Sequence, residues 1–323
     1  MQKKRVGVIG VGHLGKFHAA KYAAMEEAEL VGVADINPEL ARAVAEENST
    51  TPYGDYRQLL PLVDAVSVVV PTVHHHRVAM ECLEQGVDVM LEKPMTVNLA
   101  EADELIARAE AGNRILQVGH IERYNPAVTA LEQYLTRPLF IESHRIHMFN
   151  PRGLDVDVVL DLMIHDIDII LSIVDSPISS IHTVGVPVVT PSTDIANARI
   201  IFANGCTANI TVSRISKDNV RRLRIFQPKC YLSVDYAEKS LMVIRLKDKL
   251  NEQGMPEEEI THHKLPEHDA LEAELRDFLK NVRERTTPKV DGVQGRLALE
   301  VAQEIMSQIA ENFRRYSDVL EKS

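Results

Sequence analysis

The sequence predicts an α/β protein in which a doubly wound parallel sheet is followed by an α+β domain with a mostly antiparallel sheet. At 323 residues the chain is long enough for two domains of roughly 150 residues each. Its first 120 residues alternate short runs rich in Val and Ile with helical stretches, whereas no long helices separate the later β-rich runs. Continuous apolar strands between helices indicate parallel pairing, and closely spaced strands favour antiparallel pairing.

In the first half, expected strands and helices alternate. The strands cover residues 5–10, 29–35, 64–70, 87–92 and 114–119. The helices between them cover residues 13–26, 38–47, 74–86 and 98–111. Because parallel neighbours need a crossover, usually a helix, this order predicts a sheet covered on both faces, in a first domain of residues 1–121.

Residues 122–323 form the expected second domain. Its early helices lie at about 125–136 and 157–173. Its β-rich runs lie at 138–148, 179–190, 195–203, 206–214, 220–228, 231–236 and 240–246. The polar stretch 247–268 is expected to be a loop or a crossing hairpin. Helices at about 269–285 and 293–318 close the chain, and the second is a candidate to pack back on the first domain.

The composition argues against several classes of function. A net charge of −11 argues against a nucleic-acid partner and against an anionic membrane surface. No uninterrupted apolar stretch approaches the ~20 residues that span a bilayer. The three cysteines, Cys82, Cys206 and Cys230, are far apart and fit a reducing compartment. We therefore expect a soluble cytoplasmic protein.

A glycine motif follows the first expected strand and opens the first expected helix. It reads Gly10-Val11-Gly12-His13-Leu14-Gly15 and matches G-x-G-x-x-G. Asp35 ends the second expected strand, at the distance that the dinucleotide-binding fingerprint requires. In that fingerprint Gly10 permits a tight turn, Gly12 lets the backbone approach a pyrophosphate, and Gly15 allows close packing of helix on strand.

A carboxylate at Asp35 would accept hydrogen bonds from ribose hydroxyls and repel a 2′-phosphate, which favours NAD over NADP. The alternative is a structural turn with an incidental aspartate. The context of strand, loop and helix favours the nucleotide site.

Lys93 lies in Glu92-Lys93-Pro94, directly after a strand whose carboxyl end should face the ligand crevice. A lysine in such a place can be a general acid or base when neighbours lower its pKa from about 10.4 toward 7–8. Pro94 is a candidate to fix the turn that aims Lys93, and an X–Pro bond can do so in the cis form. A solvated lysine at the end of a strand is the alternative.

An unusually apolar helix, expected at residues 157–173, carries several ionisable groups. At about 100° per residue, four of them share one stripe about 80° wide. They are Asp157, Asp161, His165 and Asp168. Such a stripe suits a mostly buried helix that lines a cleft, with His165 and Asp161 as an acid/base or substrate-orienting pair. A satisfied buried polar network is the alternative, and Asp166 falls outside the stripe without an explanation.

The histidine clusters do not predict a metal site. His74, His75 and His76 are adjacent and cannot easily converge on one ion. His144 and His147 would point to opposite faces of a strand.

Taken together, the motifs resemble those of the glucose–fructose oxidoreductase / inositol dehydrogenase / MocA family along nearly the whole chain. In order, they are Gly10–Gly15 with Asp35, Pro71–His75–Ala79 within "PTVHHHRVA", Glu92-Lys93-Pro94, "GHIERYNP" at 119–126, Asp161-x-x-x-His165-x-x-Asp168 and "VDGVQGRLALE" at 290–300.

The resemblance implies a Rossmann domain joined to a C-terminal domain with a large open sheet, often the interface of a homo-oligomer such as a dimer or tetramer. It implies reversible hydride transfer between a sugar-like secondary alcohol and NAD, with Lys93 and His165 as acid/base residues and Asp161 assisting. Cofactor contacts implied by the family, beyond the glycine motif and Asp35, are Pro71, Thr72, His75, Glu92, Lys93 and Pro94. Of these, His75 and Glu92-Lys93-Pro94 are implied to lie beside the nicotinamide.

One segment departs from many sugar and inositol members, which carry Gly-Phe-Met-Arg-Arg-Tyr-Asp-Pro. Here it reads Gly119-His120-Ile121-Glu122-Arg123-Tyr124-Asn125-Pro126. This version resembles the branch that includes UDP-N-acetylglucosamine 3-dehydrogenases, which implies oxidation of a nucleotide-sugar 3-hydroxyl. The implied substrate-side residues are Arg123, Tyr124, Asn125, Asp161 and His165. Diphosphate binding is possible at Arg123, Arg145 and Arg152, which are equally well surface residues.

The sequence is also compatible with other functions. Within the class they are an inositol or free-sugar dehydrogenase, or an imine or bilin reductase. Outside it, a catalytically silent nucleotide-binding sensor is the alternative, although such a sensor would not need both Lys93 and His165.

Overall fold

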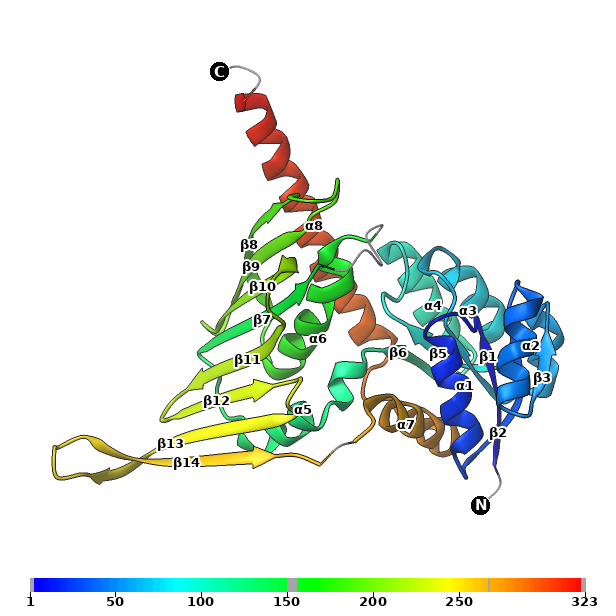
Figure 1. Cartoon of the computed structure of the whole chain (residues 1–323), viewed down its shortest axis with the longest axis horizontal. Helices are drawn as coiled ribbons and strands as arrows, with labels where there is room; N and C mark the ends of the chain where they lie inside the picture. Colours follow the sequence, from blue (N-terminus) through cyan, green and yellow to red (C-terminus); the bar gives the residue numbers. More distant parts are fainter. Residues whose placement is uncertain (1–2, 150–155, 267, 321–323) are drawn as a thin grey trace. The chain divides into compact units, whose positions relative to one another are not determined.

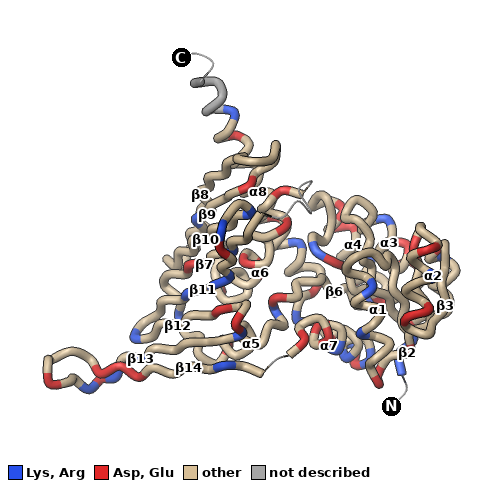
Figure 2. Tube along the Cα trace, in the orientation of Figure 1, with Lys and Arg blue, Asp and Glu red and all other residues tan. Residues whose placement is uncertain are grey.

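The structure is a computed structural model that describes residues 3–149, 156–266 and 268–320. The chain forms two compact units. The first comprises Met1–Tyr124 and Asp269–Leu299, and the second comprises Asn125–His268 and Glu300–Ser323. Acidic residues lie among basic ones along the trace of both units (Figure 2).

The first unit contains a six-stranded sheet in which every neighbouring pair is parallel. Its strands are β1 (Lys4–Ile9), β2 (Ala28–Ala34), β3 (Thr51–Tyr53), β4 (Ala65–Val68), β5 (Asp88–Glu92) and β6 (Leu116–Gly119). The order β3-β2-β1-β4-β5-β6 is that of a Rossmann fold. The strand order reverses between β1 and β4, so a ligand crevice is expected at the carboxyl ends of these strands. The predicted parallel sheet is confirmed, with β3 as an unpredicted addition.

Four helices connect these strands (Figure 1). They are α1 (Gly15–Ala24), α2 (Pro38–Glu47), α3 (His75–Glu84) and α4 (Leu99–Ala111). Local chemistry explains where two of them begin. The Asn37 side chain accepts a hydrogen bond from the backbone N–H of Glu39, and the Asn98 side chain accepts one from Glu101, which satisfies N–H groups at the start of α2 and α4.

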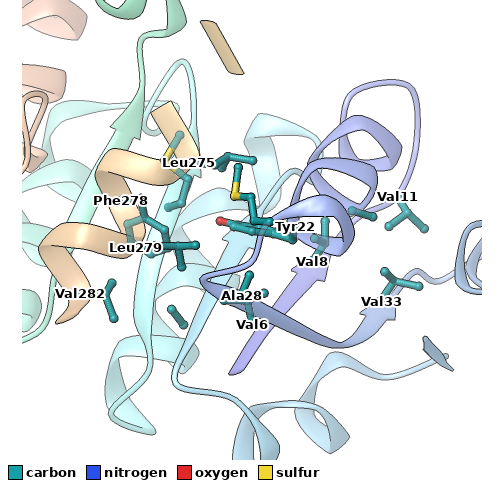
Figure 3. Packing of buried hydrophobic residues seen from close by; sticks show 14 of the residues in the cluster. Val6, Val8, Val11, Tyr22, Ala28, Val33, Leu275, Phe278, Leu279 and Val282 are labelled. Atoms are coloured by element: carbon teal, nitrogen blue, oxygen red, sulfur yellow. The ribbon is translucent and has the colours of Figure 1, made fainter. Parts of the chain in front are cut away.

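A fifth helix, α7 (Ala270–Glu284), belongs to the core of this unit (Figure 3). It contributes Leu275, Phe278, Leu279 and Val282 to a buried cluster that also contains Val6, Val8, Tyr22 and Val33. Residues 269–299 thus group with the first unit, although the sequence places them after the expected boundary at residue 121. Helix α8 (Gly292–Leu320) begins in this unit and continues into residues of the second.

The second unit contains an eight-stranded sheet of order β14-β13-β12-β11-β7-β10-β9-β8. Its strands are β7 (Phe140–Met148), β8 (Ile178–Val186), β9 (Ile195–Phe202), β10 (Thr207–Ser216), β11 (Val220–Gln227), β12 (Cys230–Asp235), β13 (Ser240–Leu250) and β14 (Pro256–Lys264). Among the described strands of this second sheet only the pair β7–β10 is parallel, so the predicted mostly antiparallel sheet is confirmed. The polar stretch after residue 246 continues as the hairpin of β13 and β14, which carries both signs of charge (Figure 2).

Helices α5 (Pro126–Leu131) and α6 (Ile164–Ile173) lie on one face of this sheet (Figure 1). On that face β7 presents the buried side chains of Ile141, Ser143 and Arg145. No helix in the described part of the chain covers the opposite face (Figure 1). Five strands present paired apolar side chains on that open face, in the register Phe140, Phe226, Tyr231, Ile244 and Ile260.

Candidate active site

The loop between β1 and α1 has the geometry of a phosphate-binding turn. Gly10 has a φ of +85°, and a Cβ on it would lie 2.7 Å from the carbonyl oxygen of Val69. A Cβ on Gly15 would lie 1.8 Å from the carbonyl oxygen of Gly10, so only glycine allows the helix to approach so closely. Apart from Gly12 itself and its two neighbours in the chain, no described atom lies within 4 Å of a Cβ built on Gly12, which leaves room for a ligand against the backbone.

Asp35 follows β2 and is tied to this loop. Its Oδ2 accepts a hydrogen bond of 2.9 Å from the backbone N–H of Val11, and its Oδ1 accepts one of 2.8 Å from Asn37. The carboxylate is therefore held beside the glycine loop, as the fingerprint requires. Ile36, the next residue, has 96% of its surface exposed.

A pocket of about 550 Å³ lies at the carboxyl end of the parallel sheet and is lined by both of these segments. It brings together most of the cofactor-site residues that the sequence singles out: Gly10, Gly12, His13, Leu14, Asp35, Pro71, Thr72, His75, Glu92 and Lys93. Gly15 and Pro94 are not among its lining residues and instead shape the turns beside it. The residues present fit a dinucleotide, because the open backbone of the glycine loop and the Asp35 carboxylate line the same pocket.

The pocket also has lining residues that the sequence interpretation missed. They include Ile36, Gly54, Tyr56, Val69, Val70, His74 and Arg77. Gly54 and Tyr56 follow β3, which is only three residues long and contains Pro52, so no apolar run marked that strand. Ile36 could have been predicted to line the pocket, because it directly follows Asp35.

Lys93 leaves β5 in a tightly bonded turn. The Lys93–Pro94 peptide is cis. The Glu92 carboxylate accepts a hydrogen bond of 3.2 Å from the Lys93 backbone N–H, and its other oxygen lies 3.1 Å from Nε2 of His18. Burial alone would raise the pKa of the Glu92 carboxyl, but its hydrogen bond with His18 and the positive charges nearby hold that pKa below its ordinary value. An ionised carboxylate therefore lies beside Lys93 in the pocket wall.

His75 joins this turn to the segment after β4. Its Nδ1 lies 3.0 Å from the carbonyl oxygen of Pro94, and its Nε2 lies 2.8 Å from that of Val70. Burial lowers the pKa of the His75 imidazole. A neutral ring donates through one nitrogen only, so one of the two carbonyl contacts is a hydrogen bond at a time.

Arg123 and Tyr124, in the segment that follows β6, are held by contacts within the first unit. The Tyr124 hydroxyl donates to Oδ2 of Asp277 at 2.7 Å, and burial together with that carboxylate raises the pKa of Tyr124. Arg123 is 7% exposed and contacts the carbonyl oxygen of Lys289 at 3.5 Å. Asn125 accepts a hydrogen bond from the backbone N–H of Ala127 at the start of α5. These three residues thus have structural contacts in addition to the substrate-side roles that the resemblance implies.

The helix that carries His165 is less regular than the sequence suggests. A π-helical turn, Val159–Met163, precedes α6, so the spacing between Asp161 and His165 departs from a uniform 100° per residue. Asp161 and His165 are partly exposed, whereas Asp168 is 3% exposed. The four residues that the sequence places on one stripe therefore differ in exposure, since Asp168 is buried and Asp161 and His165 are not. Asp157 accepts a hydrogen bond from the backbone N–H of Val159 and so caps the first turn.

Asp166, unexplained by the sequence, is the fully buried partner of Arg145. Nε of Arg145 donates to Oδ2 of Asp166 at 2.8 Å, Nη2 lies 3.2 Å from Oδ1, and the Ser143 hydroxyl donates to Oδ1 at 2.9 Å. The pair holds α6 against β7. Arg145 is 3% exposed and bound to this carboxylate, so it is neither a surface residue nor an available diphosphate ligand. Arg152 lies outside the described residues.

Within residues 3–149, 156–266 and 268–320, no three His, Cys, Asp or Glu side chains are grouped so that they could hold a metal ion. Over the same part of the chain, no helix has the length and apolar character needed to cross a membrane. His76 instead contacts Glu104 at 2.8 Å.

Comparisons with known proteins agree with this geometry. A model of an oxidoreductase family with an NAD-binding Rossmann fold matches residues 4–120, and a model of the GFO/IDH/MocA C-terminal domain matches residues 99–232. The chain is 40% identical over 302 residues to UDP-N-acetylglucosamine 3-dehydrogenase of Acidithiobacillus ferrooxidans, covering 93% of this chain and 96% of the relative. It is 26% identical over 315 residues to myo-inositol 2-dehydrogenase of Thermotoga maritima, covering 91% and 93%.

A solved structure of UDP-N-acetylglucosamine 3-dehydrogenase from Acidithiobacillus ferrooxidans superposes with a TM-score of 0.89 at 39% identity, covering 96% of this chain and 98% of that chain. The fold and the pocket define an NAD-binding oxidoreductase with a Rossmann domain. The chain belongs to the glucose–fructose oxidoreductase / inositol dehydrogenase / MocA family, and is an NAD-dependent dehydrogenase that acts on CH–OH groups.

Proposed function

We propose that this enzyme oxidises the 3-hydroxyl of UDP-N-acetylglucosamine to a 3-keto nucleotide sugar with NAD. The observation that carries the proposal is the 40% identity over 93% of the chain to a relative with that activity, against 26% to a myo-inositol dehydrogenase. The segment Gly119–Pro126 supports the same branch, because it departs from the pattern of many sugar and inositol members.

In this proposal Lys93 and His165 are the acid/base pair, and Asp161 assists His165. The Gly10–Gly15 loop holds the pyrophosphate, and Asp35 accepts hydrogen bonds from the adenosine ribose. Bound NAD supplies the hydride acceptor. Lys93 or His165 takes the proton of the sugar hydroxyl while the C3–H bond breaks and the carbonyl forms. By resemblance Arg123, Tyr124 and Asn125 are assigned to the substrate side.

The cofactor preference depends on the charge of Asp35. Asp35→Asn keeps a carbonyl oxygen for the Val11 N–H but removes the charge that would repel a 2′-phosphate. We expect NADH affinity to fall about tenfold and NADPH affinity to rise relative to it, because a hydrogen bond to a charged group contributes about 1.5–3 kcal/mol. Fluorescence titrations with both reduced cofactors measure this, with thermal unfolding as the control. An unchanged ratio of the two affinities would remove Asp35 as the discriminating residue.

We further propose that the first unit is the NAD-binding domain, and that the second carries substrate and oligomer contacts. The open face of its sheet supports this, since the row Phe140, Phe226, Tyr231, Ile244 and Ile260 is apolar and Phe226 is 37% exposed. We expect light scattering to give a dimer or tetramer, and Phe226→Glu to shift it toward the monomer mass while the far-ultraviolet circular dichroism is kept. A monomeric wild-type protein at micromolar concentration would contradict the proposal.

The direct experiment is a substrate panel. Purified protein and NAD are offered UDP-N-acetylglucosamine, other UDP-sugars, myo-inositol and glucose while NADH absorbance is followed. We expect the highest kcat/KM with UDP-N-acetylglucosamine. Turnover of inositol or glucose without turnover of any UDP-sugar would assign the enzyme to another branch. NAD binding without turnover of any of these substrates would favour a silent sensor.

A further inference from the structure

We propose that His18 is a positioning residue for the reaction: it holds the Glu92 carboxylate and, through it, the turn that presents Lys93 to the pocket. This inference rests on the role proposed above for Lys93. His18 lies on α1 and is 1% exposed, and it is not among the described residues that line the pocket. It therefore acts through Glu92, which does line the pocket.

The chemistry of the contact fixes which partner donates. An ionised carboxylate only accepts hydrogen bonds, so the hydrogen between Nε2 of His18 and Oε1 of Glu92, 3.1 Å apart, must be on the imidazole. That hydrogen is present whether the ring is neutral or protonated. Nδ1 of His18 is buried and has no hydrogen-bond partner among the described residues. The contact with Glu92 is thus what compensates for burying a polar ring here.

The Glu92 carboxylate is held from three sides. Oε1 faces His18, and Oε2 accepts from the backbone N–H of Lys93 at 3.2 Å. On the third side, a Cβ built on Gly119 would lie 3.1 Å from both the carboxyl carbon and Oε1 of Glu92. The close packing at Gly119 leaves the carboxylate little room, so α1, β6 and the turn itself determine where it lies.

Removal of the His18 N–H would leave Oε1 of Glu92 without its hydrogen-bond donor, while the positive charge of Lys93 stays nearby. The carboxylate would then reorient and alter both the backbone turn and the position of the Lys93 side chain. Displacement of a catalytic group by about 1 Å can lower a rate by about 100-fold. We therefore expect an effect on kcat rather than on cofactor binding.

Two substitutions separate the hydrogen bond from the bulk of the ring. We expect His18→Leu to lower kcat about 10- to 100-fold, with the KM of the sugar and the affinity for NADH within about threefold of wild type. His18→Gln places an amide N–H near the position of Nε2 and should recover most of kcat. Gly119→Ala presses on the same carboxylate from the other side and should lower kcat as well.

A second readout needs no substrate. Amide hydrogen exchange of Lys93, in a peptide where Pro94 contributes no amide, reports the hydrogen bond to Glu92 directly. We expect exchange to be at least tenfold faster in His18→Leu and Gly119→Ala, and near wild type in His18→Gln. Tyr22→Phe is the matched control: it lies on the same helix, is equally buried, and loses a 2.9 Å hydrogen bond with Ser67 that does not involve Glu92.

These readouts distinguish this inference from the proposed function. A wild-type enzyme that turns over no UDP-sugar would overturn the proposed substrate, while Lys93 exchange would still test His18. Wild-type kcat and wild-type Lys93 exchange in His18→Leu would overturn the role of His18. Equal effects of His18→Leu and Tyr22→Phe would show that His18 has only a general structural role, and would overturn the inference. If His18→Leu does not fold, unchanged exchange and kcat in Gly119→Ala overturn the inference.

Discussion

Lys93→Met is expected to lower kcat between about 10²- and 10⁴-fold while leaving NAD affinity within about threefold of wild type. General acid–base catalysis by a placed side chain typically contributes a factor of this size. Methionine has a similar length to lysine but cannot exchange a proton, and the Lys93 backbone N–H that donates to Glu92 is kept. Steady-state kinetics for kcat and a fluorescence titration for cofactor affinity measure the two effects separately.

Lys217→Met is the matched control, because Lys217 is an exposed lysine of the second unit outside the pocket. It should turn over at the wild-type rate. A normal kcat in Lys93→Met would show that the acid/base role belongs elsewhere. A large loss of NAD affinity in the same variant would show that Lys93 acts mainly in binding.

Asp166→Ala is expected to destabilise the protein by about 3–5 kcal/mol, because it leaves the guanidinium of Arg145 buried without the carboxylate that accepts its N–H groups. Both side chains are almost fully buried, at 0% for Asp166 and 3% for Arg145, so bulk water does not solvate the unpaired guanidinium as it would at the surface. Urea unfolding followed by far-ultraviolet circular dichroism measures the loss.

The double variant Arg145→Met/Asp166→Leu tests the cause. Since it removes both charges and fills similar volume, we expect it to be clearly more stable than Asp166→Ala. A free energy of unfolding of Asp166→Ala within about 1 kcal/mol of wild type would contradict the stabilising role of the Arg145–Asp166 pair. So would a double variant that is less stable than Asp166→Ala.

Local patterns were enough to predict the parallel sheet and the glycine loop. Strands rich in apolar residues, such as β1 and β4, can be predicted from their sequence alone. The spacing of Gly10, Gly12 and Gly15 predicts a nucleotide site because these residues lie between a strand and a helix. Pairing that depends on a distant partner was not predictable. β3 has three residues and exists through its contact with β2, and the apolar face of α7 does not reveal which sheet it covers.

The apolar helix that carries Asp161 and His165 shows the same limit at the level of single residues. Placing Asp161, His165 and Asp168 on one stripe assumed a regular helix, but a π-helical turn changes the spacing and Asp168 is buried. The partner that explains Asp166 is Arg145, which lies beside it in the fold but on a strand about 20 residues away in sequence. The catalytic roles of Lys93, His165 and Asp161 stay predictions.

Transfer of deuterium from C3 tests the central claim most directly. The enzyme is given NAD and UDP-N-acetylglucosamine labelled with deuterium at C3 of the sugar, and the reduced cofactor is analysed by mass spectrometry. The proposed reaction predicts that each NADH formed carries one deuterium. Turnover that yields unlabelled NADH would place the oxidised carbon elsewhere, and no NADH at all would contradict the proposed substrate.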